Sequence, residues 1–273
     1  MNTTVVLKAF AWAGVFFSIL SGGSAYAGII YCANPNSVYI TANQTLESTY
    51  LTMGTAPCII LQNGANLNMD GNEIQCNNEG GCGIAILVED AGSDVHDGKI
   101  LVGYLNELPT GEFFSIGLQG AEKIRRMDIH GAATAIISKR AVNAGDPDTP
   151  AKKVEKNVLT GCTDCIGVDM DVSTGAVLNN YVVVSGGGVG IEVSGTASGN
   201  GPRIERNYIR NYGTGIKADD GTKVRIKKNI VADPASTQSL QMDISSSVSP
   251  GGNLNLCADL SVCDTPEAPF TLP

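Results

Sequence analysis

The residues best suited to chemistry are four carboxylates and one lysine that follow a recurring Gly-Ile motif, namely Asp169, Asp171, Glu192, Lys217 and Asp219. The motif returns at steps of about 23 to 25 residues, so we expect these side chains on successive strands, roughly 5 Å apart. Carboxylates at that spacing suit calcium, a hard cation that takes oxygen ligands. We therefore predict Asp169, Asp171 and Glu192 as calcium ligands and all five residues as a glycan-binding strip. The plainer alternative is a solvated face whose turns are rich in Asp.

A second charged pattern alternates with aliphatic residues in Lys153-Val154-Glu155, Arg203-Ile204-Glu205 and Arg225-Ile226-Lys227. Successive side chains of a strand point to opposite sides, so we expect the aliphatic residues in the core and the charges in water. Opposite charges on neighbouring strands, such as Glu205 and Lys227, would then meet. This predicts an ion-pair ladder in which each exposed pair contributes roughly 0 to 1 kcal/mol.

Four asparagines recur at steps of 23, 27 and 22 residues, and they are Asn157, Asn180, Asn207 and Asn229. We predict that they form an asparagine ladder in a turn rather than a binding site, with amides hydrogen-bonded along the stack and the backbone in the left-handed region. Tyr181 and Tyr208 follow two of them and are predicted to stack on each other. A sugar platform is the less favoured alternative, because the chain has few aromatic residues.

These patterns predict an all-β solenoid. Each repeat contains short alternating runs separated by Gly, Asn and Asp turns, and no run with helical periodicity is long enough for a helix. Short strands that repeat at this interval are typical of a solenoid in which each turn of the chain stacks on the next. We assign residues 28–273 to one domain, with 28–62 as the N-terminal cap and first strands, 63–247 as repeat rungs and 248–273 as the C-terminal cap or tail.

Residues 1–27 have the features of a secretory signal peptide. Lys8 precedes an apolar stretch that is too short to span a bilayer, and Ala25-Tyr26-Ala27 matches a cleavage site. We therefore predict a secreted or periplasmic protein without a membrane span. A formal net charge of -9 argues against nucleic acid and anionic lipid as partners, since both need a dense Lys/Arg face. It also disfavours acidic polysaccharide unless a cation bridges the charges.

All eight cysteines lie after residue 27, and an even number in an exported chain indicates disulfides. Their near-neighbour spacing favours the pairs Cys32–Cys58, Cys76–Cys82, Cys162–Cys165 and Cys257–Cys263, although sequence alone leaves the connectivity open. A zinc or redox role for Cys162 and Cys165 is the less favoured alternative. Zinc would need two further ligands, and only His96 and His130 are present.

The repeat resembles the pectate-lyase-like superfamily of right-handed parallel β-helices. The N-terminal part is also similar to a group of secreted bacterial β-helix proteins, through Tyr31-Cys32, Ile40-Thr41, Thr45-Leu46, Cys58 and the stretch from Ala65 to Ile74. The resemblance implies a single right-handed parallel β-helix after the signal peptide. It does not define an activity, because lyases, hydrolases, epimerases, adhesins and structural proteins share this scaffold.

Two functions from different classes are therefore expected. The first is engagement of extracellular polysaccharide, by binding or by lyase-type cleavage, with a glycoside hydrolase or epimerase as less favoured enzymes. In the lyases of this superfamily a basic residue neutralises a sugar carboxylate and acidifies its α-proton, which makes Lys217 the candidate catalytic residue. Insertions from Tyr104 to Ser115 and from Ser138 to Lys152 favour a ligand groove. The second is a non-catalytic structural protein of the cell surface or matrix that self-associates through the long side of the solenoid.

Overall fold

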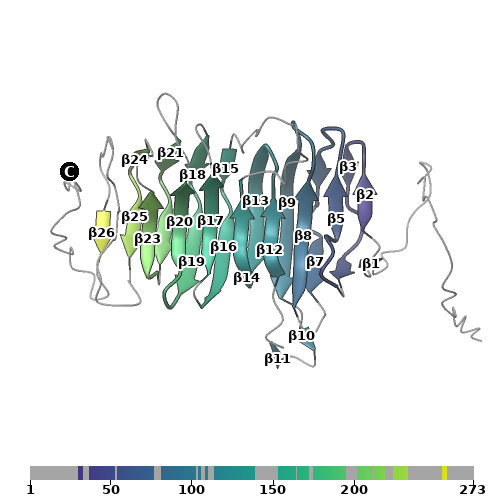
Figure 1. Cartoon of the computed structure of the whole chain (residues 1–273), viewed down its shortest axis with the longest axis horizontal. Coiled ribbons are helices and arrows are strands. Elements are labelled where there is room, and N and C mark those ends of the chain that lie inside the picture. The colour runs from purple at the N-terminus through teal and green to yellow at the C-terminus, as the bar shows by residue number, and fades with distance from the viewer. Residues whose placement is uncertain are drawn as a thin grey trace, which may run out of the picture.

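The computed structural model is an elongated stack of β-strands (Figure 1). It describes residues 30–32, 37–52, 54–76, 81–102, 104–105, 108–109, 114–138, 153–163, 165–171, 175–194, 202–210, 212–218, 224–232 and 254–256. Every regular element in these ranges is a strand, which confirms the predicted all-β fold. None of them holds a helix long and apolar enough to cross a membrane. The predicted signal peptide lies outside the described residues.

The strands form three faces. Face 1 is an eight-stranded sheet of β2 (Val38–Ile40), β5 (Ile59–Leu61), β8 (Cys82–Val88), β12 (Phe114–Gln119), β14 (Ala132–Ile137), β17 (Ile166–Asp171), β20 (Val189–Ser194) and β23 (Thr214–Ala218). A sixteen-stranded sheet turns a corner inside β9 (Asp94–Val102) and β13 (Lys123–His130), so it supplies the other two faces.

Face 2 precedes this corner in each rung and face 3 follows it. Face 2 contains the first halves of β9 and β13 together with β3 (Gln44–Thr45), β6 (Leu67–Asn68), β15 (Lys153–Glu155), β18 (Ala176–Leu178), β21 (Arg203–Glu205) and β24 (Arg225–Lys227). Face 3 contains their second halves together with β1 (Ile30–Cys32), β4 (Tyr50–Thr52), β7 (Glu73–Cys76), β16 (Val158–Thr163), β19 (Tyr181–Ser185), β22 (Tyr208–Arg210), β25 (Ile230–Ala232) and β26 (Leu254–Leu256).

Successive rungs pair in parallel. On face 2, β18 pairs with β21 through Val177 and Ile204, and β21 pairs with β24 through Ile204 and Ile226. The chain visits all three faces before it returns to the same face one rung later. Parallel strands joined by such full-turn crossovers make a β-helix, so the predicted architecture is confirmed.

The interior is filled by columns of aliphatic side chains, as the alternation predicted. On face 2, Val154, Ile204 and Ile226 are fully buried, while their charged neighbours are partly exposed. On face 1, Ile191 and Val193 are fully buried as well. Burial of such side chains stabilises the fold by roughly 1.5 to 3 kcal/mol each.

The corner between face 2 and face 3 contains the predicted asparagine ladder. Asn157, Asn180, Asn207 and Asn229 are buried, and each amide nitrogen of the first three donates to the side-chain oxygen of the next at 2.9 to 3.0 Å. The left-handed backbone lies one residue earlier than predicted, with φ between 56° and 58° at Lys156, Asn179, Arg206 and Lys228. The ladder amides therefore point inward, and the residue before each one stands exposed at the tip of the corner.

Two of the predicted disulfides are present. Cys32 is bonded to Cys58 and Cys76 to Cys82, with Cα atoms 5.1 and 5.7 Å apart. Cys165 is disulfide-bonded too. The side chains of Cys162, Cys257 and Cys263 lie outside the described part of the chain, so the other two pairings stay predictions.

The first predicted insertion contains the antiparallel pair β10 (Tyr104–Leu105) and β11 (Leu108–Pro109), which projects from the stack in Figure 1. Residues 139–152 of the second insertion lie outside the described residues. A groove between the two insertions therefore stays a prediction. Near the C-terminus, β26 pairs in parallel with β25 and extends face 3.

Candidate functional site

The strip predicted from the Gly-Ile motif lies on face 1. Asp169 on β17, Glu192 on β20 and Lys217 on β23 are neighbours in register. The Lys217 ammonium lies 2.5 Å from a carboxylate oxygen of Glu192. Asp171 belongs to β17, but its side chain, like all of Asp219, lies outside the described part of the chain.

The calcium site predicted at Asp169, Asp171 and Glu192 stays a prediction, because the side chain of Asp171 lies outside the described part of the chain. No group of three or more His, Cys, Asp or Glu side chains that could hold a metal occurs in the part of the chain that the structure describes. Among the predicted ligands, Glu192 is already paired with the Lys217 ammonium, and a cation beside that ammonium would be repelled. The roles predicted for this strip in glycan binding and for Lys217 in catalysis stay predictions.

The two histidines lie on opposite sides of the corner. His96 on face 2 places its Nδ1 2.6 Å from Asp97, and His130 on face 3 places its Nε2 2.6 Å from Asp128. Asp97 also pairs with the Arg126 guanidinium on the next rung. Hydrogen bonding from Arg126 first, and from His96 second, holds the pKa of Asp97 well below its usual range, while Asp97 raises the pKa of Arg126. Each histidine is thus bound to its own aspartate.

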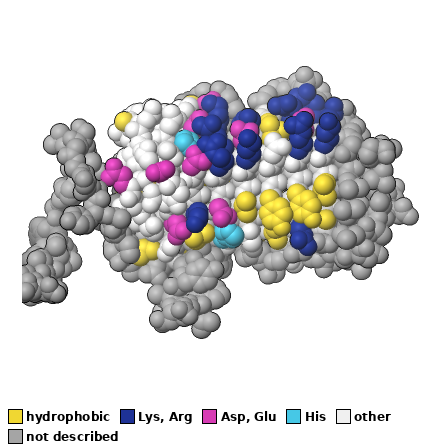
Figure 2. Space-filling view, turned by 180° about the vertical axis from the view of Figure 1, so that it is seen from behind, with side chains coloured by type: hydrophobic (Ala, Val, Ile, Leu, Met, Phe, Trp, Pro, Cys, Tyr) yellow, Lys and Arg dark blue, Asp and Glu magenta, His cyan; other side chains and the backbone are white. Residues whose placement is uncertain are grey.

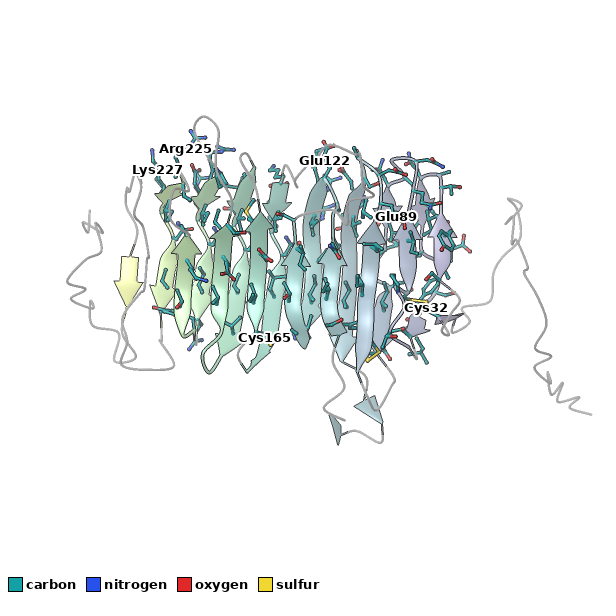
Figure 3. The ribbon with its side chains drawn as sticks, viewed as in Figure 1. Cys32, Glu89, Glu122, Cys165, Arg225 and Lys227 are labelled. Atoms are coloured by element: carbon teal, nitrogen blue, oxygen red, sulfur yellow. A yellow bond between two sulfur atoms is a disulfide. The ribbon has the colours of Figure 1, made fainter. Side chains whose placement is uncertain are left out.

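A different cluster, at the C-terminal rungs of face 2 and its corner, is strongly basic. We define the basic surface as Lys156, Arg203, Arg206, Arg225, Lys227 and Lys228. Some of these side chains stand at the left-handed tips of the corner, and the others flank the buried Ile204 and Ile226 on β21 and β24. Figure 2 shows Lys and Arg side chains gathered along this part of the stack. Figure 3 shows Arg225 and Lys227 projecting from its edge.

Cations nearer the N-terminus of the same face have acidic partners. Lys123 Nζ lies 3.4 Å from Asp94, and Lys153 Nζ lies 2.8 Å from Glu155. Arg126 forms two hydrogen bonds with the carboxylate of Asp97. Each of these charges is therefore largely neutralised within the fold.

The cations of the basic surface have no such partners among the residues that the structure describes. No ion pair or side-chain hydrogen bond joins any of them to an acid there. The predicted pair of Glu205 and Lys227 is not formed, although these residues are neighbours in register on β21 and β24. A parallel register places two such residues side by side, but it does not determine which rotamers their long side chains adopt.

This arrangement is electrostatically unfavourable in the free protein. Arg203 and Arg225 stand directly opposite each other, and like charges in that position destabilise a sheet. The Nε atom of Arg225 is buried without a hydrogen-bond partner among the described residues, and such a group costs roughly 1 to 3 kcal/mol. An anion that accepts hydrogen bonds would relieve both effects. The basic surface is therefore suited to bind anions, despite the net charge of -9 for the whole chain.

A partly exposed apolar row runs beside the basic surface on face 3 (Figure 2). It consists of Val158, Tyr181, Tyr208 and Ile230, which are in register on β16, β19, β22 and β25. The rings of Tyr181 and Tyr208 are stacked, as predicted, with centroids 5.5 Å apart and planes 7° from parallel. Val158 and Tyr181 are each 39% exposed, so the row is open to a ligand.

Sequence reasoning recognised the alternating cations but not their concentration. It treated the net charge as a property of the whole surface and expected Glu205 to neutralise Lys227. It also left out Lys156, Arg206 and Lys228, which come directly before the ladder asparagines. That position was the available signal, because the residue before an inward ladder amide must point outward at the corner.

Comparisons of this chain with protein-family models, with curated proteins and with solved structures found no match. The architecture is therefore established by the structure itself, which is a parallel β-helix. Membership of the pectate-lyase-like superfamily stays a resemblance in repeat pattern and fold.

Proposed function

We propose that this protein binds an acidic polysaccharide through the basic surface, without catalysis and without a bridging cation. The observation that carries the proposal is a group of cations on neighbouring strands and corner tips that have no acidic partner among the residues the structure describes. Guanidinium groups bind carboxylates with paired hydrogen bonds. A surface that is already ordered loses little conformational entropy when it binds.

The neighbouring tyrosines favour a glycan over a nucleic acid. Single-stranded nucleic acids bind by stacking bases on exposed aromatic faces. The rings of Tyr181 and Tyr208 are stacked on each other, so the face that each ring turns to the other is closed to a base. Disulfides such as Cys32–Cys58 are typical of proteins outside the cytosol, where polysaccharide is the abundant anionic polymer.

Retention on immobilised polygalacturonate and alginate tests the proposal, with dextran as the uncharged comparison. We expect the wild-type chain to bind both uronate polymers at low salt and to elute as salt rises, because salt screens the charges. The double variant Arg203→Gln/Arg225→Gln should bind about tenfold more weakly or worse. Lys99→Gln is the matched control, since it removes one cation that is paired with Glu73 at 3.1 Å.

Four results would contradict the proposal. Equal retention on dextran, or an unchanged affinity in the double variant, would show that the basic surface is not the site. Unsaturated sugar product, detected by its ultraviolet absorbance and lost in Lys217→Ala, would support the lyase hypothesis instead. Filaments that form with rising protein concentration, together with no glycan retention, would support the structural alternative.

A further inference from the structure

The apolar row has the right position to take part in the same binding event. Each rung carries one exposed residue at the tip of the corner, one buried ladder asparagine and then one member of the row, as in Arg206, Asn207 and Tyr208. Three of the four tips are cations, Lys156, Arg206 and Lys228, and on those rungs charge and apolar surface are separated by a single inward residue; the tip before Tyr181 is the neutral Asn179. A ligand chain wide enough to cover the corner would contact both.

The two kinds of surface are continuous only along the axis of the solenoid. Along the rung of Arg206 and Tyr208 the outward chemistry changes from cationic to aromatic within two residues. Across rungs the row repeats from Val158 to Ile230 in register, and the tips of the corner repeat beside it. Four rungs at the usual strand spacing span about 14 Å. A linear polymer with regularly repeated carboxylates matches this direction.

The stacking of Tyr181 on Tyr208 limits which part of a sugar can contact the two rings. Their ring centroids lie 5.5 Å apart in a stack, so the faces that the two rings turn to each other are closed to a sugar. Tyrosine hydroxyls donate and accept hydrogen bonds, and sugar hydroxyls do the same. The outer rings therefore suit the polar edge of a pyranose, while Val158 and Ile230 extend the apolar contact at either end.

We infer that the apolar row is the second half of the binding site, and that an acidic glycan lies along the solenoid axis with carboxylates on the basic surface and sugar hydroxyls on Tyr181 and Tyr208. This inference rests on the proposed function. It adds the direction of the bound chain and the residues that recognise its sugar rings. It also requires the ligand to be a linear uronate polymer rather than a compact anion.

The test measures affinity for oligogalacturonates of increasing length by calorimetry, with the full chain. We expect affinity to rise with length until the oligomer spans the four rungs and then to level off. Tyr181→Phe/Tyr208→Phe keeps the stack and removes both hydroxyls, so it should weaken binding of the longest oligomer about tenfold. Tyr181→Ala/Tyr208→Ala should weaken it further. Tyr39→Ala is the control, because Tyr39 is 60% exposed on β2, away from both surfaces.

The single variants Tyr181→Phe and Tyr208→Phe test the direction of the chain. Both should weaken binding of the long oligomer if it crosses rungs, whereas a chain lying along one rung would respond to only one of them. Unchanged affinity in both double tyrosine variants, with binding still lost in Arg203→Gln/Arg225→Gln, would overturn this inference and leave the proposed function standing. No binding by the wild-type chain would overturn both. Tighter binding of single-stranded DNA than of polygalacturonate would identify a nucleic acid as the ligand and overturn both as well.

Discussion

The N-terminal and C-terminal rungs turn the same corner with different chemistry. In β9 and β13 the inward corner positions are Gly98 and Met127, and the side chain of Met69 packs where a Cβ on Gly98 would lie. The outward tips there are Asp97 and Arg126, which pair with each other across rungs. This part of the corner is apolar inside and neutralised outside.

In the C-terminal rungs the inward position is an asparagine, and the outward charges lack acidic partners within the part of the chain that the structure describes. Asn180 donates to Asn207, and Asn207 donates to Asn229. Each of these amides also reaches a backbone carbonyl of the preceding rung, as Asn207 does with Val177 at 2.9 Å. Outside, Arg206 and Lys228 stand at the tips without acidic partners among the described residues.

This contrast indicates that the corner does not need surface ion pairs to hold its shape. A buried and satisfied amide ladder fixes the backbone from within. The outward side chains are then free to be selected for a ligand. We therefore expect the amide ladder to stabilise the corner and the outward side chains to serve ligand binding. The predictions begin with the substitution whose expected effect is greatest.

Asn207→Ala should lower the free energy of unfolding by about 2 to 4 kcal/mol. The change leaves the amide of Asn180 and the carbonyl of Val177 without their buried partner. Chemical denaturation measures the loss. The matched control is Asn179→Gly, which alters an exposed amide at a positive φ of 56° that glycine tolerates. Equal losses in the two variants would show that the ladder does not fix the corner.

Gly117→Ala and Gly190→Ala should each cost roughly 1 to 3 kcal/mol, because face 1 is built alike in both halves of the molecule. An added Cβ would lie 2.5 Å from the backbone oxygen of Ala135 at Gly117, and equally close to that of Gly215 at Gly190. Relieving this clash requires the backbone of the neighbouring rung to shift, which costs free energy. Thermal unfolding of the two variants measures the effect. A loss at only one of the two positions would mean that the halves also differ on face 1.

Arg203→Gln/Arg225→Gln should raise the free energy of unfolding of the ligand-free protein by roughly 0.5 kcal/mol at low salt. The change removes repulsion between like charges that stand opposite each other. High salt should abolish the gain, because it screens that repulsion. Lys123→Gln is the control from the paired half and should lower stability slightly, since Lys123 has Asp94 as a partner. A destabilised double variant would indicate that these arginines support the fold.

Asp97→Asn should lower stability at neutral pH by less than about 1 kcal/mol, because the pair with Arg126 is partly exposed. The pKa of Asp97 is lowered in the folded protein. Its contribution is therefore fully present above the unfolded pKa of about 4 and is lost as pH falls toward the lower folded value. Unfolding measured from pH 7 down to pH 2 should show the two proteins converging in acid. A gap that widens in acid would contradict this sign.

Much of the fold could be predicted because a solenoid repeats its pattern along the chain. The alternation around Val154, Ile204 and Ile226 defined the buried side of face 2. Burial of aliphatic side chains is favourable, so the side of the strand that carries them faces the core. The spacing of Asn157 and Asn180 predicted the ladder for the same reason. The left-handed residue was misplaced by one position, since sequence spacing does not tell which residue of a tight turn takes the positive φ.

The candidate site could be predicted less well. Asp169, Glu192 and Lys217 do stand together on face 1, but the pairing of Lys217 with Glu192 was not foreseen. Charged side chains are long and exposed, and their partners depend on rotamers that a sequence pattern does not define. The same reason explains why Glu205 was wrongly paired with Lys227.

The sequence by itself determined that this protein is an all-β solenoid, which side chains enter its core, and that four asparagines stack. Those features follow from local alternation and a repeated interval, so they need no knowledge of the third dimension. The folded stack was needed to show that cations from separate rungs meet beside the two tyrosines without acidic partners among the described residues. That outcome depends on the tilt of the corner, the register between rungs and the direction of each long side chain, which are properties of the folded stack.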